Sequence, residues 1–86
     1  MIRIKSVIPK GGYRLEVQLE NGSSIILNFS DRLHTVRFGL LNDKAFFRRA
    51  VSDGDFVRWD NKIEISVSEV LQLAQKENFK RKYHDK

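Results

Sequence analysis

Apolar and polar residues alternate along the first third of the chain, which predicts β-strands. Ile2 and Ile4 alternate with Arg3 and Lys5, and residues 13–20 (YRLEVQLE) alternate without a break. A period of two places the apolar side chains on one face of a strand and the polar ones on the other. We therefore expect two strands with one solvated face each, the first of which ends at Pro9 and Gly11-Gly12.

A third strand should follow the Asn21-Gly22 turn, and the apolar pattern decides its register. A two-residue turn would set Leu15 against Asn28, whereas a three-residue turn with Gly22 in the left-handed conformation would set Leu15 against Leu27. A one-residue slip would turn every side chain to the other face. The bulged turn is therefore predicted, and its pairs are Leu19 with Ser23, Val17 with Ile25, Leu15 with Leu27 and Tyr13 with Phe29.

The middle of the chain predicts short helical pieces. Ser30 or Asp31 can cap a turn of helix, but Thr35, Val36 and Gly39 disfavour a long one. Further on, Asn42 or Asp43 can cap a short helix that holds Ala45, Phe46 and Phe47. Its solvent side would carry three cations, Lys44, Arg48 and Arg49.

A second hairpin is predicted after the Asp53–Asp55 turn. Its strands should be Phe56–Trp59 and Lys62–Ile65, on either side of Asp60-Asn61. Trp59 shares a face with Val57 and has two interpretations. It either closes the core against a helix, as large aromatic residues do in small domains, or lies exposed as an anchor for a protein partner.

The last helix has the clearest start signal. Ser66 with Glu69 three residues later is a capping box, and Val67, Val70, Leu71 and Ala74 then recur at helical spacing. Continued at 100° per residue, the same face would carry only polar and charged residues after position 77. The packed part of the helix should therefore end near residues 75–78.

These elements predict one α+β domain: a small antiparallel sheet of two or more hairpins with a short middle helix and a C-terminal helix. We assign it to residues 1–77, because 86 residues can form one core. Residues 78–86 (NFKRKYHDK) should form a basic, flexible tail. Cysteine is absent, and no apolar run approaches the length of a signal peptide or membrane span, so we expect a cytoplasmic protein that does not enter a membrane.

The net charge of +5 is concentrated near the C-terminus. Residues 76–86 have a net charge of +3, which leaves +2 for the other 75 residues. Cations that converge on one track would suit nucleic acid, and aromatic residues such as Phe79 and Tyr83 could stack on bases. The residues with potential to contact a partner or nucleic acid are Arg37, Lys44, Arg48, Arg49, Arg58, Trp59, Lys80, Arg81 and Lys82.

The side chains needed for catalysis or cofactor binding are lacking in the sequence. His34 and His84 have no second ligand at metal-binding spacing, and Gly11-Gly12 lacks the lysine and helix of a phosphate loop. The Asp53–Asp55 turn lacks the remaining ligands of a calcium loop. We assign no catalytic, metal-binding or cofactor-binding residue and expect a protein that is not an enzyme.

Two segments carry a resemblance to a known family. They are residues 13–33 (YRLEVQLENGSSIILNFSDRL) and residues 38–71 (FGLLNDKAFFRRAVSDGDFVRWDNKIEISVSEVL). Together they resemble the small bacterial family catalogued as domain of unknown function 2442, over roughly Val7 to Leu71. The matching landmarks are the F-x-x-L-x-D-x-x-x-F run at Phe38, Leu41, Asp43 and Phe47, and the turn and hairpin residues Gly22, Trp59 and Asn61.

This chain departs from the family at two places. It has Trp59-Asp60-Asn61-Lys62 where the family usually has Trp-Pro-Asn-Gly, and it has Asn28 where an acidic residue is usual. The resemblance implies a small cytoplasmic module. Such modules are sometimes joined to a helix-turn-helix domain or encoded beside another tiny protein in a pairing similar to toxin and antitoxin.

The leading functional hypothesis is a non-enzymatic protein-interaction or regulatory module, antitoxin-like, that binds a protein partner through a sheet edge or the second hairpin and its flanking helix. The alternative is a nucleic-acid-binding protein that uses Arg48, Arg49, Arg58 and the basic tail. Edge-to-edge pairing of strands would also allow a homodimer. Convergence of the cations on one face would favour the alternative, and dispersal would disfavour it.

Overall fold

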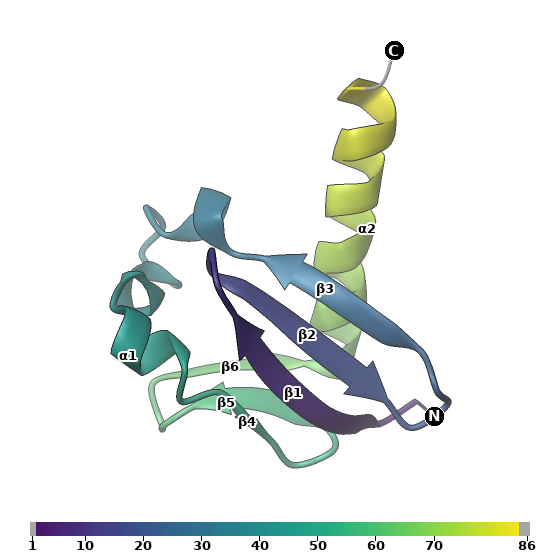
Figure 1. Cartoon of the computed structure of the whole chain (residues 1–86), viewed down its shortest axis with the longest axis horizontal. Helices are drawn as coiled ribbons and strands as arrows, with labels where there is room; N and C mark the ends of the chain where they lie inside the picture. Colours follow the sequence, from purple (N-terminus) through teal and green to yellow (C-terminus); the bar gives the residue numbers. More distant parts are fainter. Residues whose placement is uncertain (1, 85–86) are drawn as a thin grey trace.

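The fold consists of two three-stranded antiparallel sheets and a C-terminal helix, which confirms the predicted α+β class (Figure 1). The computed structural model describes the backbone of residues 2–84 and the side chains of residues 2–76. The first sheet has the order β1-β2-β3 (Ile4–Lys10, Arg14–Leu19, Ser24–Asn28), and the second has the order β4-β5-β6 (Val51–Ser52, Phe56–Trp59, Ile63–Ser66). Between them lie η1 (Ser30–Arg32), η2 (Gly39–Asn42) and α1 (Lys44–Phe47), and α2 (Val67–His84) comes last.

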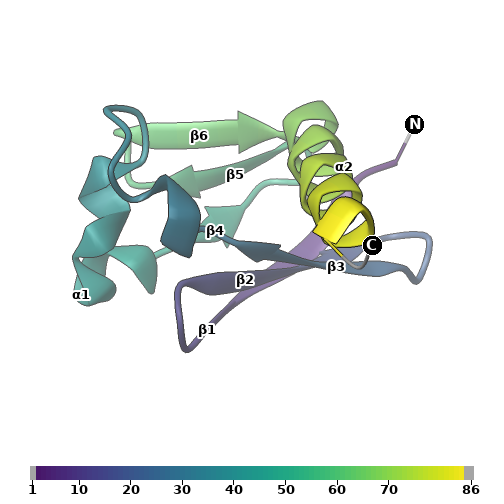
Figure 2. The ribbon, with the colours of Figure 1, turned by 90° about the horizontal axis from the view of Figure 1, so that it is seen from above.

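The two sheets form layers that enclose the core. Seen from above, α1 lies at one end of the layers and α2 at the other (Figure 2). Strands β1 and β4 contact each other, and the backbone N–H of Ile4 donates to the carbonyl of Gly54 at 2.8 Å. Helix α2 contacts β3 and β6, the last strand of each sheet. The helix therefore covers the side of the core that the strands leave open.

The first hairpin has the register that its apolar pattern predicts. Leu15 pairs with Leu27 and Val17 pairs with Ile25. Gly22 adopts a φ of +93°, in the left-handed region, and its N–H donates to the carbonyl of Leu19 at 3.1 Å. The bulged three-residue turn is thus confirmed.

Strand β1 extends further than predicted. Gly11-Gly12 ends it as expected, but Pro9 lies inside it and pairs with Leu15, so the prediction that Pro9 ends the strand is wrong. Within its sheet β1 pairs only with β2, and an edge strand tolerates a residue without an N–H. The start of the chain also differs from its prediction, which placed Ile2 and Ile4 on one buried face: Ile4 is buried, but Ile2 is exposed. The register of β1 shifts close to this point, between Ile4 and Ser6.

Trp59 lies at the centre of the core and is fully buried. Its ring meets Phe29 edge-on at 5.7 Å between centroids and stacks near Phe47 at 6.3 Å. The indole N–H donates to the carbonyl of Phe47 at 3.0 Å, so the polar group of this large side chain is satisfied. The core interpretation of Trp59 is confirmed, and its place among the candidate contact residues was wrong because no part of it reaches the surface.

The second sheet differs from its prediction in two details. Strand β4 has only two residues and was not predicted. In the hairpin, Trp59 pairs with Ile63 rather than Lys62, because Lys62 belongs to the turn. Asp60 takes a left-handed φ of +54°, which allows the three-residue connection.

Helix α1 begins at a predicted capping residue, Asp43. The predicted cap of η1 by Ser30 or Asp31 is wrong, because Phe29 occupies the N-cap position and no side chain forms a capping bond there. The carboxylate of Asp43 accepts hydrogen bonds from the backbone N–H of Ala45 at 2.9 Å and of Phe46 at 3.3 Å. These bonds satisfy donors that the first turn of α1 leaves unpaired. Phe47 is consequently directed into the core, while Lys44 and Arg48 remain exposed.

Helix α2 begins as predicted, but only half of the capping box forms. The Ser66 hydroxyl accepts from the Glu69 N–H at 3.2 Å, whereas the Glu69 carboxylate binds Arg37 instead of returning to the helix start. Val70 and Leu73 are buried, and Val67, Leu71 and Ala74 are half-buried. The packed face thus includes Leu73, which the predicted stripe omitted.

The backbone of α2 continues as helix to His84, and its last turns project beyond the two sheets (Figure 1). Residues 78–84 of the predicted tail are therefore helical in backbone, and residues 85–86 lie outside the described residues. The expected flexibility of this segment stays a prediction.

Gly22→Ala should lower the free energy of unfolding by about 1–2 kcal/mol, because an L-residue is strained at a left-handed φ. Gly11→Ala is the matched control, since φ is not positive there and the added Cβ meets no heavy atom within 4 Å. The control should change stability by less than about 0.5 kcal/mol. Urea unfolding of both variants measures the difference, and equal losses would contradict the assigned turn.

Candidate binding surface

Arg37 is held at the start of α2. Its guanidinium forms a two-pronged ion pair with the Glu69 carboxylate, with Nη2 to Oε1 at 2.7 Å, and also donates to the backbone carbonyl of Glu64 at 3.0 Å. The Glu69 hydrogen bond raises the pKa of Arg37 above its ordinary value. The guanidinium carbon also lies 5.0 Å from the ring centroid of Phe38. This cation therefore links the loop before η2 to the second sheet and α2.

Arg58 is held on the outer side of the second sheet. Its guanidinium donates to Asp53 at 3.1 Å from Nε and also forms an ion pair with Glu64. The backbone N–H groups of Asp55 and Phe56 are the main reason that the pKa of Asp53 lies below its ordinary value, and Arg58 adds to the effect. Arg58 thus stabilises the β4–β5 turn and carries compensated charge.

The five body cations proposed as a patch do not act as one group. Arg37 lies at the start of α2 and Arg58 on β5, while Arg49 pairs with Asp60 at 3.4 Å. Three of the five therefore have a carboxylate partner, which reduces the positive potential available to phosphate. The other two, Lys44 and Arg48, belong to a separate feature.

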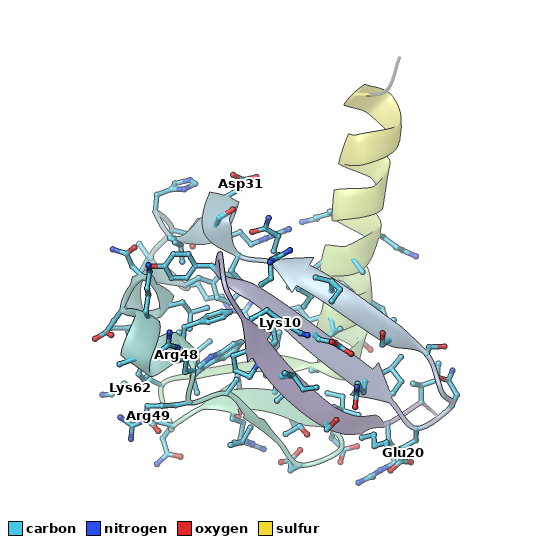
Figure 3. All side chains as sticks on the ribbon, viewed as in Figure 1. Lys10, Glu20, Asp31, Arg48, Arg49 and Lys62 are labelled. Carbon is cyan, nitrogen blue, oxygen red and sulfur yellow. The ribbon has the colours of Figure 1, made fainter. Side chains whose placement is uncertain are left out.

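Lys44 and Arg48 line an open hollow between α1 and the β1–β2 turn. Its volume is about 280 Å³, and its other lining residues are Pro9, Lys10, Gly11, Gly12, Tyr13 and Phe47. In Figure 3, Arg48 lies beside α1 and Lys10 lies on β1. The hollow therefore brings together cations that are more than 30 residues apart in the sequence.

The wall of this hollow at Tyr13 is held by several contacts. Tyr13 has a φ of +60°, which is uncommon for a residue with a side chain, and it follows Gly12 at +73°. Its hydroxyl donates to the carbonyl of Asn42 at 2.6 Å, and its ring meets Phe47 edge-on at 5.7 Å. Contacts from η2 and α1 thus hold the turn in its left-handed conformation.

The outer face of the first sheet carries exposed apolar side chains. Ile8 and Ile26 pair with Glu16 from either side and are 39% and 48% exposed. The Gln18 amide is the main cause that lowers the pKa of Glu16, and Lys10 lowers it further. Since α2 lies at the side of the two layers, this outer face is left uncovered (Figure 2).

The remaining candidates, Lys80, Arg81 and Lys82, belong to the projecting turns of α2. Their side chains lie outside the described residues, so their part in any surface stays a prediction. The backbone shows that this segment extends away from the sheets (Figure 1).

No group of three or more His, Cys, Asp or Glu side chains in the described part of the chain is placed to hold a metal ion. No described helix has the length and apolar content required to cross a membrane.

Lys10 and Tyr13 line the hollow but were not among the residues predicted from the sequence. Lys10 followed an expected strand end, and no sequence signal indicates that a tyrosine will take a positive φ. The hollow exists only because the β1–β2 turn packs beside α1, about 30 residues further along the chain. A cluster of that kind depends on tertiary packing and has no local pattern.

Comparison with known proteins supports the fold. No family model matches the chain, and no curated protein matches it. A similar solved structure is that of "Putative DNA Binding Protein NE0471" from Nitrosomonas europaea ATCC 19718, with a TM-score of 0.74 and 20% sequence identity. The match covers 91% of this chain and 52% of the other, so this chain spans about half the length of that protein. At this identity the likeness shows a shared fold.

Asp53→Asn should weaken the dependence of stability on acid pH. Folding lowers the pKa of Asp53 below its ordinary value of 3.8. The ionised carboxylate therefore stabilises the fold fully at pH values above 3.8. This stabilisation is lost as the pH falls from 3.8 through the lowered folded pKa. Urea unfolding between about pH 5 and pH 2 should therefore show a shallower decline in the variant.

Glu20→Gln is the matched control, because it removes an equal charge from an exposed position. Equal flattening of the acid dependence in both variants would trace the effect to net charge and contradict the specific role of Asp53.

Proposed function

We propose that this protein is a non-enzymatic interaction module with a regulatory, antitoxin-like role, and that it binds a protein partner. The observation that carries the proposal is the projection of α2 beyond the sheets (Figure 1). Most helical stability in proteins comes from tertiary packing, so a partner that packs against these turns would stabilise them. Binding of a helix in a groove of a partner is a common mode of recognition.

The chemistry of the projecting segment specifies the partner further. Its sequence combines two aromatic residues, Phe79 and Tyr83, with three cations, Lys80, Arg81 and Lys82. Aromatic residues supply most of the energy of many protein interfaces, whereas cations favour an acidic rim. A partner with an apolar groove bordered by carboxylates fits this composition.

The surface of the sheets is consistent with a protein partner. Among the described residues, Arg37, Arg49 and Arg58 are each paired with a carboxylate, so these three cations do not form the convergent positive track that nucleic acid requires. The exposed pair Ile8 and Ile26 offers a second apolar contact on the uncovered sheet face. A homodimer stays a prediction. Helix α2 contacts β3 and β6, so it affects which strand edges are available for pairing with a second copy.

When the full chain is used as bait in a pull-down from its native host, the proposal predicts that a specific small protein is recovered. Binding of the purified partner, measured by calorimetry, should weaken at least tenfold in a Phe79→Ala/Tyr83→Ala variant, since an aromatic anchor contributes more than about 1.4 kcal/mol. Val36→Ala, at a fully exposed loop position, is the control and should bind normally. Failure to recover any reproducible protein, or equal weakening in both variants, would reject the proposal.

The second candidate is nucleic-acid binding, which the name of the similar solved structure and the cations near the C-terminus favour. Replacing Lys80, Arg81 and Lys82 by Gln should lower the slope of log K against log salt concentration by about 2–3, as expected for three lost phosphate contacts. Fluorescence anisotropy with DNA and RNA measures this slope. Absence of binding at about 50 mM salt would end this candidate.

Membership in the family of domain of unknown function 2442 also stays a proposal. Three of its landmark residues have defined structural roles here: Gly22 forms the left-handed turn, Asp43 caps α1 and Trp59 centres the core. These roles explain why a fold of this kind would keep such residues. They support a shared fold more directly than a shared partner.

A further inference from the structure

We propose that the hollow between α1 and the β1–β2 turn is a binding site for a phosphate group. Its lining includes three cations, Lys10, Lys44 and Arg48, of which Lys10 and Arg48 are labelled in Figure 3. The inference goes beyond the proposed protein interaction and does not depend on it, because the hollow lies at the α1 end of the molecule and the projecting helix lies at the other (Figure 2).

The charge balance around the hollow is positive. Two nearby carboxylates oppose its three cations, and both already have partners. Glu16 pairs with Lys10 at 3.3 Å, and Asp43 directs its carboxylate to the backbone N–H groups of α1. Lys44 and Arg48 are exposed, and no carboxylate lines the hollow itself. A bound anion would therefore meet one guanidinium and one ammonium directly, with Lys10 at the border.

A further cation lies at the border of the hollow. Arg14 donates from Nε to the carbonyl of Gly11 at 2.9 Å. This bond partly neutralises a backbone acceptor that would otherwise repel an anion. The positive potential thus extends over the turn residues Gly11 and Gly12.

The chemistry of these groups suits phosphate. An arginine can offer two parallel N–H donors to a phosphate, and a lysine supplies a mobile point charge. A volume of about 280 Å³ lies at the low end of small-molecule sites, so the hollow has room for a phosphate group and part of the molecule that carries it. The lack of side chains at Gly11 and Gly12 lets a ligand approach the backbone closely.

The Tyr13 wall of the hollow, on the side away from Lys44 and Arg48, is preformed. The left-handed Tyr13 is held by its hydrogen bond to Asn42 and by its ring contact with Phe47, whose carbonyl in turn accepts from Trp59. Backbone strain of this kind occurs often at ligand sites and persists where surrounding contacts maintain it. A rigid wall with mobile cations on the other side lowers the ordering cost of binding.

The test is a titration of the full chain with inorganic phosphate, followed by the amide NMR shifts of Gly11, Gly12 and residues 44–48. We expect saturable shifts at these amides, and a dissociation constant that increases at least tenfold in the Lys44→Gln/Arg48→Gln variant. The matched control is Arg49→Gln/Lys62→Gln, which removes the same charge from exposed positions that do not line the hollow (Figure 3). The control should bind within twofold of the parent.

Chloride at equal ionic strength tests whether charge alone explains the effect. Shifts that do not saturate, that chloride reproduces, or that weaken equally in both variants would overturn the proposal. Unchanged spectra elsewhere in each variant verify that it folds.

A nucleoside 5′-monophosphate distinguishes the source of the phosphate. The nucleotide would be recognised as an organic phosphate if its affinity is at least tenfold above that of inorganic phosphate and is lost in the Lys44→Gln/Arg48→Gln variant. The remaining part of the molecule would then also contact the hollow. Equal affinity, lost in the same variant, would identify the phosphate group as the sole recognised feature. Binding of the nucleotide that survives in the variant would overturn the site.

Discussion

The structure depends most on the contacts of one side chain, the indole of Trp59. It joins the two layers, because it extends from β5 of the second sheet and meets Phe29, which follows β3 of the first. Its N–H binds the carbonyl of Phe47 and thereby attaches α1 to the same centre. In a chain of 86 residues without cysteine, packing of this kind replaces the covalent links that stabilise many small domains.

The position of α1 links this core to the molecular surface. Phe47 contributes its ring and carbonyl to the core, while the neighbouring Lys44 and Arg48 face the hollow. The same ring of Phe47 supports Tyr13, which shapes the opposite wall. The geometry of the proposed phosphate site is therefore a consequence of how the core is packed, since the cations occupy the solvent side of a helix whose inner side Trp59 holds in place.

The charged residues of the body act mainly within the fold. Arg37 connects the loop before η2 with α2, and Arg58 connects two strands with the turn between β4 and β5. A count of cations overstates the surface available to a polyanion, because exposed ion pairs contribute little stability yet cancel local potential. The surfaces proposed for partners are the projecting part of α2, the uncovered face of the first sheet and the hollow beside α1.

The sequence by itself determined the α+β class, the register of the first hairpin, a capped helix start at Asn42 or Asp43 and the start of α2, because each depends on neighbouring residues or on alternation along one strand. The structure selected Asp43 as the cap. The sequence did not reveal β4, the path of β1 through Pro9, or the turn that places Lys62 outside β6. Only the tertiary structure decided the partners of Arg37 and Glu69 and the meeting of the β1–β2 turn with α1. Those contacts join residues about 30 positions apart, and no local pattern records which distant side chain a charged group will meet.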